Sequence, residues 1–469
     1  MLQLSELLDC VWNLLLLGAV LCSAALTIFL TTLPTRYLPH QQQAKEGVSE
    51  KNHNNVTVQI VVLGDIGRSP RMQYHALSIA KHGGHVDLIG YNESDLHPEI
   101  TSNSLITIVP IAPSPRIFQT SNKLLFLFVA PLKIFWQIWS LYSVLGYRTK
   151  AAKWMLVQNP PSIPTLAIAQ YMCLFRNTRL IIDWHNFGYS ILALKLGEAH
   201  PIVKISRIYE QFCARSAAAH FTVTNAMSKV LKNSFGVDAL PLHDRPPKHF
   251  QPLSSEQRSS FLPCLPETAK YAKELQAGTR KLIVSATSWT PDEDFSLLLN
   301  ALVNYSTATT SNPGLPKILA IITGKGPQKE HYISIIARLN NGGKLSNIDI
   351  TTAWLSMQDY ASLLGAADMG ISLHTSSSGV DLPMKVVDMF GTGLPVLGWS
   401  KFEAWPELVT EDVNGKGFGS AEELAGLLAE VLGTDEKLAR LREGAMLECE
   451  RRWDEEWDPV AGRLLGLVD

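Results

Sequence analysis

The sequence predicts an α/β protein with two doubly wound domains that face a cleft, preceded by an N-terminal transmembrane helix. Three observations predict this fold class. Short apolar runs rich in β-branched residues alternate with helical patterns along most of the 469 residues, which is typical of parallel sheets covered on both faces. A Pro-rich segment interrupts the alternation once, near residue 245. An uncharged apolar run at residues 14–33 precedes the first strand.

The first domain is predicted over residues 56–240. It begins with a strand at Val56–Leu63 that ends at Gly64, followed by a helix at Met72–Lys81. The further strands expected in this domain are His85–Tyr91, Ser104–Pro110, Trp154–Gln158, Leu180–Asp183 and Ala219–Thr224. Short apolar strands of this kind, separated by helices, indicate βαβ units.

The second domain is predicted over residues 276–440, after an interdomain hinge at 241–275 whose first residues read PLHDRPPKHFQPLSSEQ. Its expected strands are Lys281–Ala286, Lys317–Thr323, Ile348–Thr352, Met369–Leu373 and Pro395–Leu397. A C-terminal helix is expected over 441–469, and one interpretation returns it to the first domain. Ligands of such sheets bind at the carboxyl ends of the strands.

The run at residues 14–33 is long enough to span a bilayer as a helix. We therefore predict a membrane anchor at 1–35 and a polar linker at 36–55. A cleaved signal peptide is the competing interpretation, but the run is longer than a signal core of about 7–15 residues and no Lys or Arg precedes it. Acidic residues before the run and basic residues after it predict that the domains face the cytosol. The sequons at Asn55, Asn92 and Asn304 would then be unused.

A second apolar and aromatic stretch, residues 123–145, has two interpretations. It is either a buried helix of the first domain or a helix in the membrane interface, with Trp136 and Trp139 at the level of the lipid headgroups. Pro131, Lys133 and Gln137 count against a clean membrane span.

Composition excludes several classes of function. The net charge of −2 provides no basic field for nucleic acid. Six scattered cysteines have no metal-ligand spacing, which argues against zinc and disulfides and fits a reducing compartment. We expect no bound metal and no prosthetic group.

The loop after the first strand, LGDIGRSPRMQYHA, has the features of an anion site. Gly67 permits a tight turn, and Arg68, Ser69 and Arg71 lie at the start of a helix, whose free N–H groups favour anions. An ordinary βα turn with solvated arginines is the alternative. The glycines do not match the dinucleotide fingerprint, so NAD binding is not expected.

The segment IIDWHNFGYS places His185 just after a strand that ends near Asp183. An imidazole beside a carboxylate can remove a proton from a hydroxyl at neutral pH. The alternative is a histidine that only caps the next segment.

Three loops of the second domain are candidates for a nucleotide site. In SATSWTPDEDF, Ser288, Trp289 and Thr290 follow a strand, and the acids after Pro291 suit a first helical turn. In ITGKGP, Lys325 and Gly326 follow another strand, where glycine lets a ligand approach the backbone. A plain turn explains either loop equally well.

The third of these loops, SSSGVDLPMKVVDMFG, carries the strongest signal. The helix after Leu382, Pro383 and Met384 offers free N–H groups to an anion. A positive charge such as that of Lys385 is unfavourable in the first turn of a helix, so we expect Lys385 to bind a negatively charged ligand. Asp381 and Asp388 are acceptors suited to sugar hydroxyls, although Asp388 could also bond backbone within the helix.

Taken together, these blocks resemble a glycosyltransferase of the B-type, which has two Rossmann-like domains. GDIGRSPRMQYHA, DWHNFGYS, SWTPDEDF, ITGKGP and SSGVDLPMKVVDMFG, in this order, resemble the signatures of the chitobiosyldiphosphodolichol β-mannosyltransferase family over residues 56–460. The resemblance implies GDP-mannose as donor and a GlcNAc disaccharide on dolichol diphosphate as acceptor. It also implies the cytosolic face of the endoplasmic reticulum membrane as location, and other mannosyltransferases of the same pathway as partners.

The chain departs from the wider superfamily at two places. Many relatives carry two glutamates eight positions apart; the second aligns with Asp388, but the first falls on Val380. An Arg and a Lys that hold the diphosphate in many relatives fall near Ser288 and Asp294. The charge of the diphosphate must then be met by Lys385, the helix start at 382–384, and Lys325 or Arg245.

The implied reaction inverts the anomeric carbon in one displacement, because the donor is α-linked and the product of the family is β-1,4-linked. We expect His185, oriented by Asp183, to act as base; Asp183 itself, Asp65 and Glu407 are the alternatives. Arg68 and Arg71 are expected to hold the acceptor diphosphate. Other functions left open are a membrane-tethered sugar-nucleotide-binding protein without activity, and a transferase with a different acceptor, either another lipid diphosphate or a soluble glycoconjugate.

Overall fold

The computed structural model describes residues 12, 15–24, 27, 32–38, 56–115, 123–290 and 293–469. It forms two compact units. The first comprises Met1–Val157, Pro161–Ile181 and Ser216–Ala218, and the second comprises Gln158–Pro160, Ile182–Arg215 and Ala219–Asp469.

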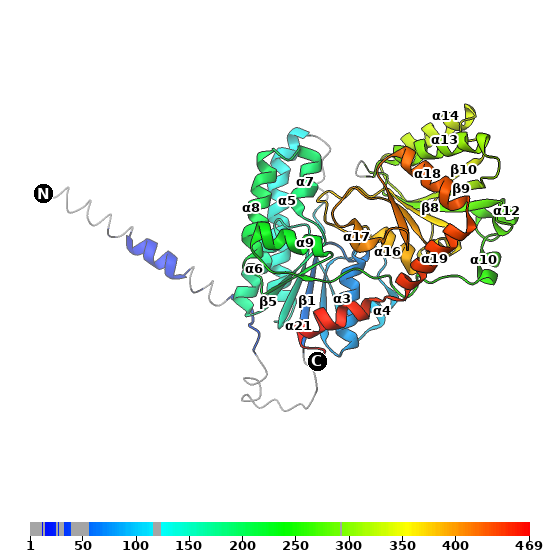
Figure 1. The fold of residues 1–469 in the computed structure, drawn as a ribbon. Coiled ribbons are helices and arrows are strands. Elements are labelled where there is room, and N and C mark those ends of the chain that lie inside the picture. Colours follow the sequence, from blue (N-terminus) through cyan, green and yellow to red (C-terminus); the bar gives the residue numbers. More distant parts are fainter. Residues whose placement is uncertain are drawn as a thin grey trace. The chain divides into compact units, whose positions relative to one another are not determined.

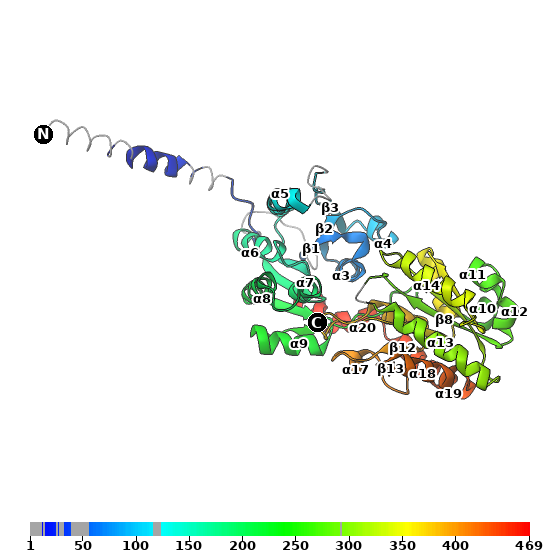
Figure 2. The same cartoon turned by 90° about the horizontal axis from the view of Figure 1, so that it is seen from above.

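The described residues contain two sheets, of seven and six strands (Figures 1 and 2). The strand orders are β3-β2-β1-β4-β5-β6-β7 and β10-β9-β8-β11-β12-β13. The strand pairs of known register are parallel in both sheets. The prediction of two parallel α/β sheets is confirmed.

The strands of the first sheet are β1 (Thr57–Asp65), β2 (His85–Tyr91), β3 (Ile106–Pro110), β4 (Trp154–Asn159), β5 (Arg179–Trp184), β6 (Ala219–Thr222) and β7 (Leu240–Pro241). The helices along this part of the chain are α3 (Pro70–Lys81), α4 (Pro98–Ser102), α5 (Lys123–Ser143), α6 (Thr165–Arg176), α7 (Gly188–Leu196), α8 (Pro201–Ala214) and α9 (Asn225–Val230). In β1, residues 58 and 60–62 are at most 1% exposed, as expected for a central strand covered on both faces.

The strands of the second sheet are β8 (Arg280–Ala286), β9 (Lys317–Thr323), β10 (Ile348–Ala353), β11 (Met369–Ser372), β12 (Val396–Trp399) and β13 (Gly415–Phe418). Its flanking helices are α13 (Phe295–Ser311), α14 (Lys329–Asn341), α15 (Met357–Ala366), α16 (Met384–Gly391), α17 (Trp405–Leu408), α18 (Ala421–Leu432) and α19 (Asp435–Glu450). Residues 241–275, predicted as a hinge, contain α10 (Ser255–Phe261), α11 (Pro266–Ala269) and α12 (Ala272–Gln276). Residues 441–469, predicted as a C-terminal helix, comprise the end of α19, then α20 (Trp453–Trp457) and α21 (Arg463–Leu465).

Alternation along the strands of the second sheet divides its core into two layers. In β8, Ile283 packs in a cluster with α13 and α18, whereas Leu282 and Val284 pack in a second cluster with α15 and α16. Successive side chains of a strand point to opposite faces, so the strand must be apolar throughout. This is why the β8 and β9 sequences contain uninterrupted apolar runs.

The predicted transmembrane helix lies largely outside the described residues. Of the run at 14–33, the structure describes residues 15–24, 27, 32 and 33, of which 15–24 and 27 are helical. No helix in the described part of the chain is both long and apolar enough to cross a membrane. Residues 1–11 of the predicted anchor and 39–55 of the predicted linker are not described.

The predicted helix at 123–145 forms as α5, and its end has two different sides. Leu141 and Leu145 are fully buried, whereas Phe135 is 67% exposed and Trp139 is 56% exposed. One side of this segment is therefore buried, as a helix of the first domain would be, and large apolar side chains remain accessible on the other side.

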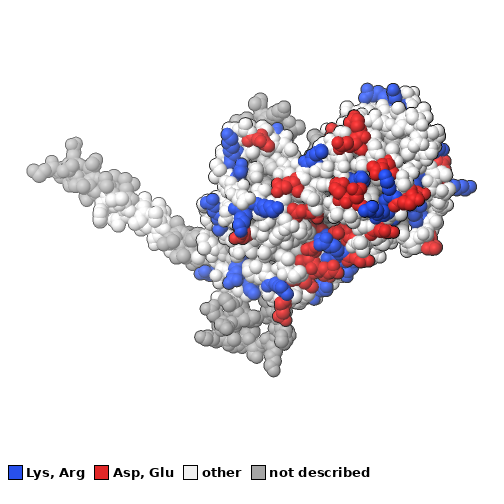
Figure 3. All heavy atoms as spheres, in the orientation of Figure 1, with Lys and Arg blue, Asp and Glu red and all other residues white. Residues whose placement is uncertain are grey.

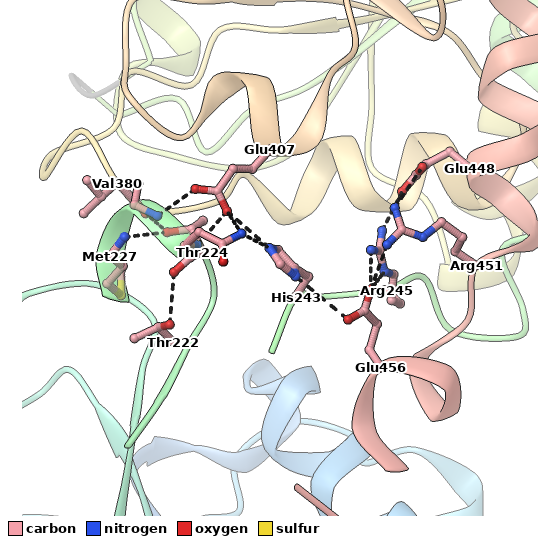
Figure 4. Close-up of polar contacts among 12 residues, drawn as sticks. Thr222, Thr224, Met227, His243, Arg245, Val380, Glu407, Glu448, Arg451 and Glu456 are labelled. Atoms are coloured by element: carbon pink, nitrogen blue, oxygen red, sulfur yellow. Dashed lines mark hydrogen bonds and ion pairs between the residues drawn. The ribbon is translucent and has the colours of Figure 1, made fainter. Parts of the chain in front are cut away.

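A polar network ties the segment after β7 to α9, α17, α19 and α20 within the second unit (Figure 4). Glu407 accepts hydrogen bonds from the backbone N–H groups of Asn225 and Ala226 at the start of α9, and it contacts His243. Arg245 pairs with Glu448 and Glu456. Buried charges are tolerated when they are paired in this way.

The stability of the fold is expected to depend on pH through His243, which belongs to this network. Hydrogen bonds to Glu407 and Glu456 raise the pKa of His243 from 6.5 to about 9. A raised pKa stabilises the fold fully below the unfolded value, and the contribution is lost as pH rises through the folded value. We expect His243→Ala to lower the stability by about 1–3 kcal/mol at pH 6, and the difference from wild type to shrink towards pH 9. Thermal melts across this range test it. A difference that stays constant with pH, or an equal effect from the exposed control His331→Ala, would contradict the assignment.

Candidate functional site

The carboxyl ends of three neighbouring strands of the second sheet, β9, β8 and β11, carry the predicted nucleotide loops, and β10 adds a fourth loop that was not predicted. Because β10, β9, β8 and β11 are parallel neighbours, the loops that follow them lie at one edge of the sheet. This common edge brings together residues 287–290, 293–294, 324–328, 354–357 and 373–385, which are dispersed in the sequence.

The loop after β8 is organised around the carboxylate of Glu293, which is 4% exposed. Its Oε2 accepts hydrogen bonds from the Thr287 hydroxyl at 2.7 Å and from the Ser288 N–H at 2.6 Å. Its Oε1 pairs with the ammonium of Lys385, which also contacts the Ser288 hydroxyl at 3.4 Å. The ion pair therefore joins the loop after β8 to the start of α16.

The position of Glu293 corrects the expectation for the acids after Pro291. They were predicted to lie in the first turn of a helix. Asp292 lies outside the described residues, and α13 begins only at Phe295, with Asp294 as its N-cap accepting from the Ser296 N–H at 3.0 Å. Trp289, before them, is 1% exposed and has φ +50°. Buried Trp289 packs on Phe295, so its ring stabilises the loop rather than facing a ligand.

Two glycines after β9 are required by a close approach to this loop. A Cβ on Gly324 would lie 1.8 Å from the Thr287 carbonyl oxygen, and one on Gly326 would lie 1.8 Å from that of Ser288. Gly324 also has φ +128°, which other residues rarely adopt. The glycines thus have a packing reason, independent of any ligand.

Replacing Gly326 with alanine is expected to lower the stability by about 2–4 kcal/mol, because the backbone of Ser288 would have to move. The affinity for the nucleotide predicted to bind at these loops should fall with it, since the same movement displaces the groups around Lys385. Thermal melts and titration with that nucleotide measure the two effects. The control is Gly426→Ala, because nothing lies within 4 Å of the position that the added Cβ would take. Gly343→Ala is not a suitable control, because Gly343 has a positive φ. Wild-type stability of the Gly326 variant would contradict the steric argument.

A hollow of about 270 Å³ opens beside these glycines. It is lined by Thr323, Gly324, Trp354, Leu355, Ser356, Met357 and Tyr360. Lys325 lies over the ring of Trp354, with its ammonium 3.9 Å from the ring centroid, and Trp354 is 63% exposed. An accessible aromatic face beside a polar loop is suited to stacking a planar base.

The loop before α16 is held together by hydrogen bonds to the carboxylate of Asp381, which is 7% exposed. Its carboxylate accepts from the hydroxyl of Ser376 and lies 3.1 Å from the ring of His374. The next residues, Leu382 and Pro383, lead directly into α16, which begins at Met384. Asp381 therefore organises the loop, whereas it was predicted as an acceptor for sugar hydroxyls.

Asp388, one turn into α16, has an unusual protonation state. Burial, with the nearby charge of Asp244, raises its pKa from 3.8 to about 8, although Lys385 acts in the opposite direction. A carboxyl group whose pKa is raised holds its proton more readily than an ordinary aspartate, and in the protonated form it can donate a hydrogen bond as well as accept one.

The predicted catalytic pair is formed. Nε2 of His185 lies 2.9 Å from Oδ2 of Asp183, whose side chain is fully buried. The following residues contact the loop before α16: the amide of Asn186 donates to the Ser377 hydroxyl at 3.1 Å, and Ser190 lies 3.3 Å from the same hydroxyl. The DWHNFGYS segment and the SSSGVDLP loop therefore meet within the second unit.

The predicted acceptor loop, Gly67 to Arg71, lies in the first unit between β1 and α3. A Cβ on Gly67 would lie 2.7 Å from the Ser94 carbonyl oxygen, so this position requires glycine. The side chain of Arg68 is 82% exposed, whereas Arg71 is 3% exposed. Ser69 is also buried, so of these residues Arg68 is the accessible cation.

Two other expectations concern charge and metal. Arg245, a candidate for the donor diphosphate, is only 8% exposed and is paired with two carboxylates, those of Glu448 and Glu456. Among the described residues no group of three or more His, Cys, Asp or Glu side chains has a metal-binding arrangement.

On the face shown in Figure 3, acidic and basic side chains are interspersed.

Two residues of the site were not singled out from the sequence. Ser377 is one of several serines in its loop, and Trp354 is a single aromatic residue after a strand. The one usable signal was positional: both follow the carboxyl end of a predicted parallel strand.

Comparisons with known proteins identify close relatives. A protein of Arthroderma benhamiae named chitobiosyldiphosphodolichol beta-mannosyltransferase is 51% identical over 446 residues, covering 94% of this chain and 96% of the relative. A protein of the same name from Yarrowia lipolytica is 41% identical over 451 residues, covering 95% and 94%. No family model matches the chain.

The fold itself has solved counterparts. Anabaena Alr3699/HepE, crystallised with UDP and glucose, covers 88% of this chain and 99% of its own length, with a TM-score of 0.59 and 13% identity. At this identity the likeness shows the fold alone.

Proposed function

The chain belongs to the chitobiosyldiphosphodolichol beta-mannosyltransferase family, which makes it a glycosyltransferase, and we propose that it transfers mannose from GDP-mannose to a dolichol-diphosphate-linked GlcNAc disaccharide. The transfer forms a β-1,4 bond and releases GDP. The observation that carries this proposal is the 51% identity over nearly the whole chain to a relative with that name.

The donor is proposed to bind at the carboxyl edge of the second sheet. The guanine base enters the hollow lined by Trp354, and the diphosphate meets Lys385 and the free N–H groups at the start of α16. Lys385 stabilises the charge that develops on the leaving diphosphate. Asp388, half-buried one turn into α16, is proposed to bind a ribose or mannose hydroxyl, and its raised pKa favours a form that can donate a hydrogen bond.

The acceptor hydroxyl is proposed to lose its proton to Nδ1 of His185, because Nε2 faces Asp183. The oxygen at C4 of the acceptor then forms a bond with C1 of mannose while the bond from C1 to the phosphate oxygen breaks. The electron pair leaves with GDP, and the proton remains on His185 as an imidazolium that Asp183 stabilises. The two other carboxylates considered as bases have structural roles: Oδ1 of Asp65 accepts from three backbone N–H groups, and both oxygens of Glu407 are engaged.

The acceptor diphosphate is proposed to bind Arg68. Replacing Arg68 with alanine is expected to raise the KM for the lipid acceptor about 10-fold or more, since a charge-assisted hydrogen bond contributes about 1.5–3 kcal/mol. The KM for GDP-mannose should stay unchanged. Steady-state kinetics with each substrate varied in turn measure both constants, and Lys81→Ala at the far end of α3 is the control. Equal weakening of donor and acceptor would contradict the assignment.

The remaining expectations follow from the lipid acceptor and stay proposals. A dolichol chain remains in the bilayer, so the enzyme must act at a membrane surface, because each CH₂ withdrawn costs about 0.8 kcal/mol. We place the chain at the endoplasmic reticulum membrane, anchored through residues 1–35, with its two sheets in the cytosol and other mannosyltransferases of the pathway nearby.

Transfer of label from GDP-mannose to the lipid-linked disaccharide tests the proposed function. Purified chain, labelled donor and the acceptor in vesicles should yield a labelled lipid that β-mannosidase, but not α-mannosidase, converts back to free mannose. UDP-glucose in place of GDP-mannose serves as the donor control. Binding of GDP-mannose without any transfer would instead identify a sugar-nucleotide-binding protein.

A further inference from the structure

Helix α8 of the second unit exposes more large apolar side chains than it buries. Four large apolar side chains point outward, whereas its buried residues are Val203, Ser206, Glu210, Cys213 and Ala214. The exposed residues are Ile202 at 53%, Ile205 at 63%, Ile208 at 64% and Phe212 at 73%. In a globular protein the apolar stripe of a surface helix normally faces the core, so the outward stripe needs a partner.

The neighbouring helix α7 extends this apolar surface. Helices α7 and α8 pack side by side (Figures 1 and 2), and Ile191, Leu194 and Leu196 of α7 are 38%, 58% and 42% exposed. We call these seven side chains the α7–α8 apolar surface. Large contiguous apolar patches on soluble proteins mark interaction sites.

The charges beside this surface are predominantly basic. Lys204 and Arg207 lie on α8 next to the stripe, and Lys195 lies between the exposed leucines of α7; all three are exposed. Over residues 188–215 the acids are Glu198 and Glu210, and Glu210 is buried and accepts the N–H of Gly188 at 2.8 Å. An apolar stripe flanked by Lys and Arg is the pattern of helices that lie in the interface of an anionic bilayer.

We propose that the α7–α8 apolar surface inserts into the headgroup region of a membrane that carries anionic lipids. A second copy of the chain is the main competing occupant, but it would bring like charges together around the apolar stripe. The choice of a bilayer also rests on the proposed function, because an acceptor with a dolichol tail is presented only at such a surface. The surface holds the second unit, with His185 and the loop before α16, at the level of the acceptor.

Site-specific quenching tests insertion directly. The full chain with Cys10, Cys22 and Cys264 replaced by serine receives one new cysteine, Ile205→Cys, labelled with an environment-sensitive fluorophore. Vesicles of phosphatidylcholine and phosphatidylserine with brominated acyl chains should quench this probe, and phosphatidylcholine alone should quench it less. The control is Leu447→Cys on α19, a position that is 67% exposed and should not be quenched.

Activity separates docking from chemistry. The variant Ile205→Glu/Phe212→Glu should transfer mannose to an acceptor embedded in vesicles at least about tenfold more slowly than wild type. The reason is that the loss of inserted apolar area should weaken the affinity for the membrane by more than about tenfold. With a short-chain isoprenoid acceptor dispersed in detergent, it should match wild type. The control variant Val413→Glu/Leu447→Glu changes two exposed apolar residues outside the surface and should match wild type on both acceptors.

Absence of quenching at residue 205 in both kinds of vesicle would overturn the proposal. A probe response that depends on protein concentration without vesicles would overturn it in favour of a contact between copies. If the proposed function fails instead, the wild type transfers nothing to either acceptor while the quenching remains, so the two failures are distinguishable.

Discussion

Replacing His185 with alanine is expected to lower the turnover number for mannose transfer by about 10²–10⁴-fold, while the KM for GDP-mannose changes little. The imidazole lies 2.9 Å from a fully buried carboxylate, which orients the ring and stabilises the imidazolium formed when the acceptor loses its proton. Steady-state kinetics at saturating acceptor measure the loss. Added imidazole should restore part of the turnover, which would not happen if the residue had only a structural role.

Two further variants give this prediction its control. Asp183→Asn should retain more activity than the alanine variant at 185, because the ring remains but is no longer held by a charge. His331→Ala changes an exposed histidine on α14 and should have wild-type turnover. Turnover within a few-fold of wild type for His185→Ala, in a protein with a normal thermal midpoint, would exclude the histidine as base.

The fold could be predicted from the sequence because uninterrupted apolar runs specify parallel strands. The strands β2 and β9 have the predicted bounds. Strand β13 was not predicted, because Gly415, Lys416 and Gly417 are typical of a turn. It forms through tertiary contact: a Cβ on Gly415 would lie 2.4 Å from the Val396 carbonyl oxygen of β12, so glycine is required where the neighbouring strand approaches closely. Local propensity contains no information about such an approach.

The candidate site could be predicted only as a set of loops. Sequence order placed Lys385, Ser288 and Lys325 after strands, and the parallel sheet brings those strand ends to one edge. The partners could not be predicted. Glu293 had a sufficient local explanation as a first-turn acid, and Arg245 had one as a cation for phosphate, but ion pairs over 92 and 203 residues along the chain determine their roles.

Replacing Lys385 with methionine is expected to lower kcat/KM for GDP-mannose by about 10²–10³-fold, because the leaving diphosphate loses its cation. The variant should also be less stable by about 3–5 kcal/mol, since the carboxylate of Glu293 would remain buried without its partner. Kinetics and thermal melts measure the two effects, but the single variant alone does not separate them.

The double variant Lys385→Met/Glu293→Gln separates catalysis from stability. Glutamine keeps the shape of Glu293 and removes its charge, so the buried site no longer needs a cation, and the thermal midpoint should return close to that of wild type. The transfer rate should stay as low as in the single variant, because the diphosphate still lacks the cation at the start of α16 and keeps only the backbone N–H groups there. A double variant that regains activity within a few-fold of wild type would show that Lys385 serves only to neutralise Glu293. A double variant that is stable but inactive would establish that the ion pair positions Lys385 for the donor. In that variant the loop after β8 remains folded although the ion pair is gone, so the loss of activity cannot come from unfolding.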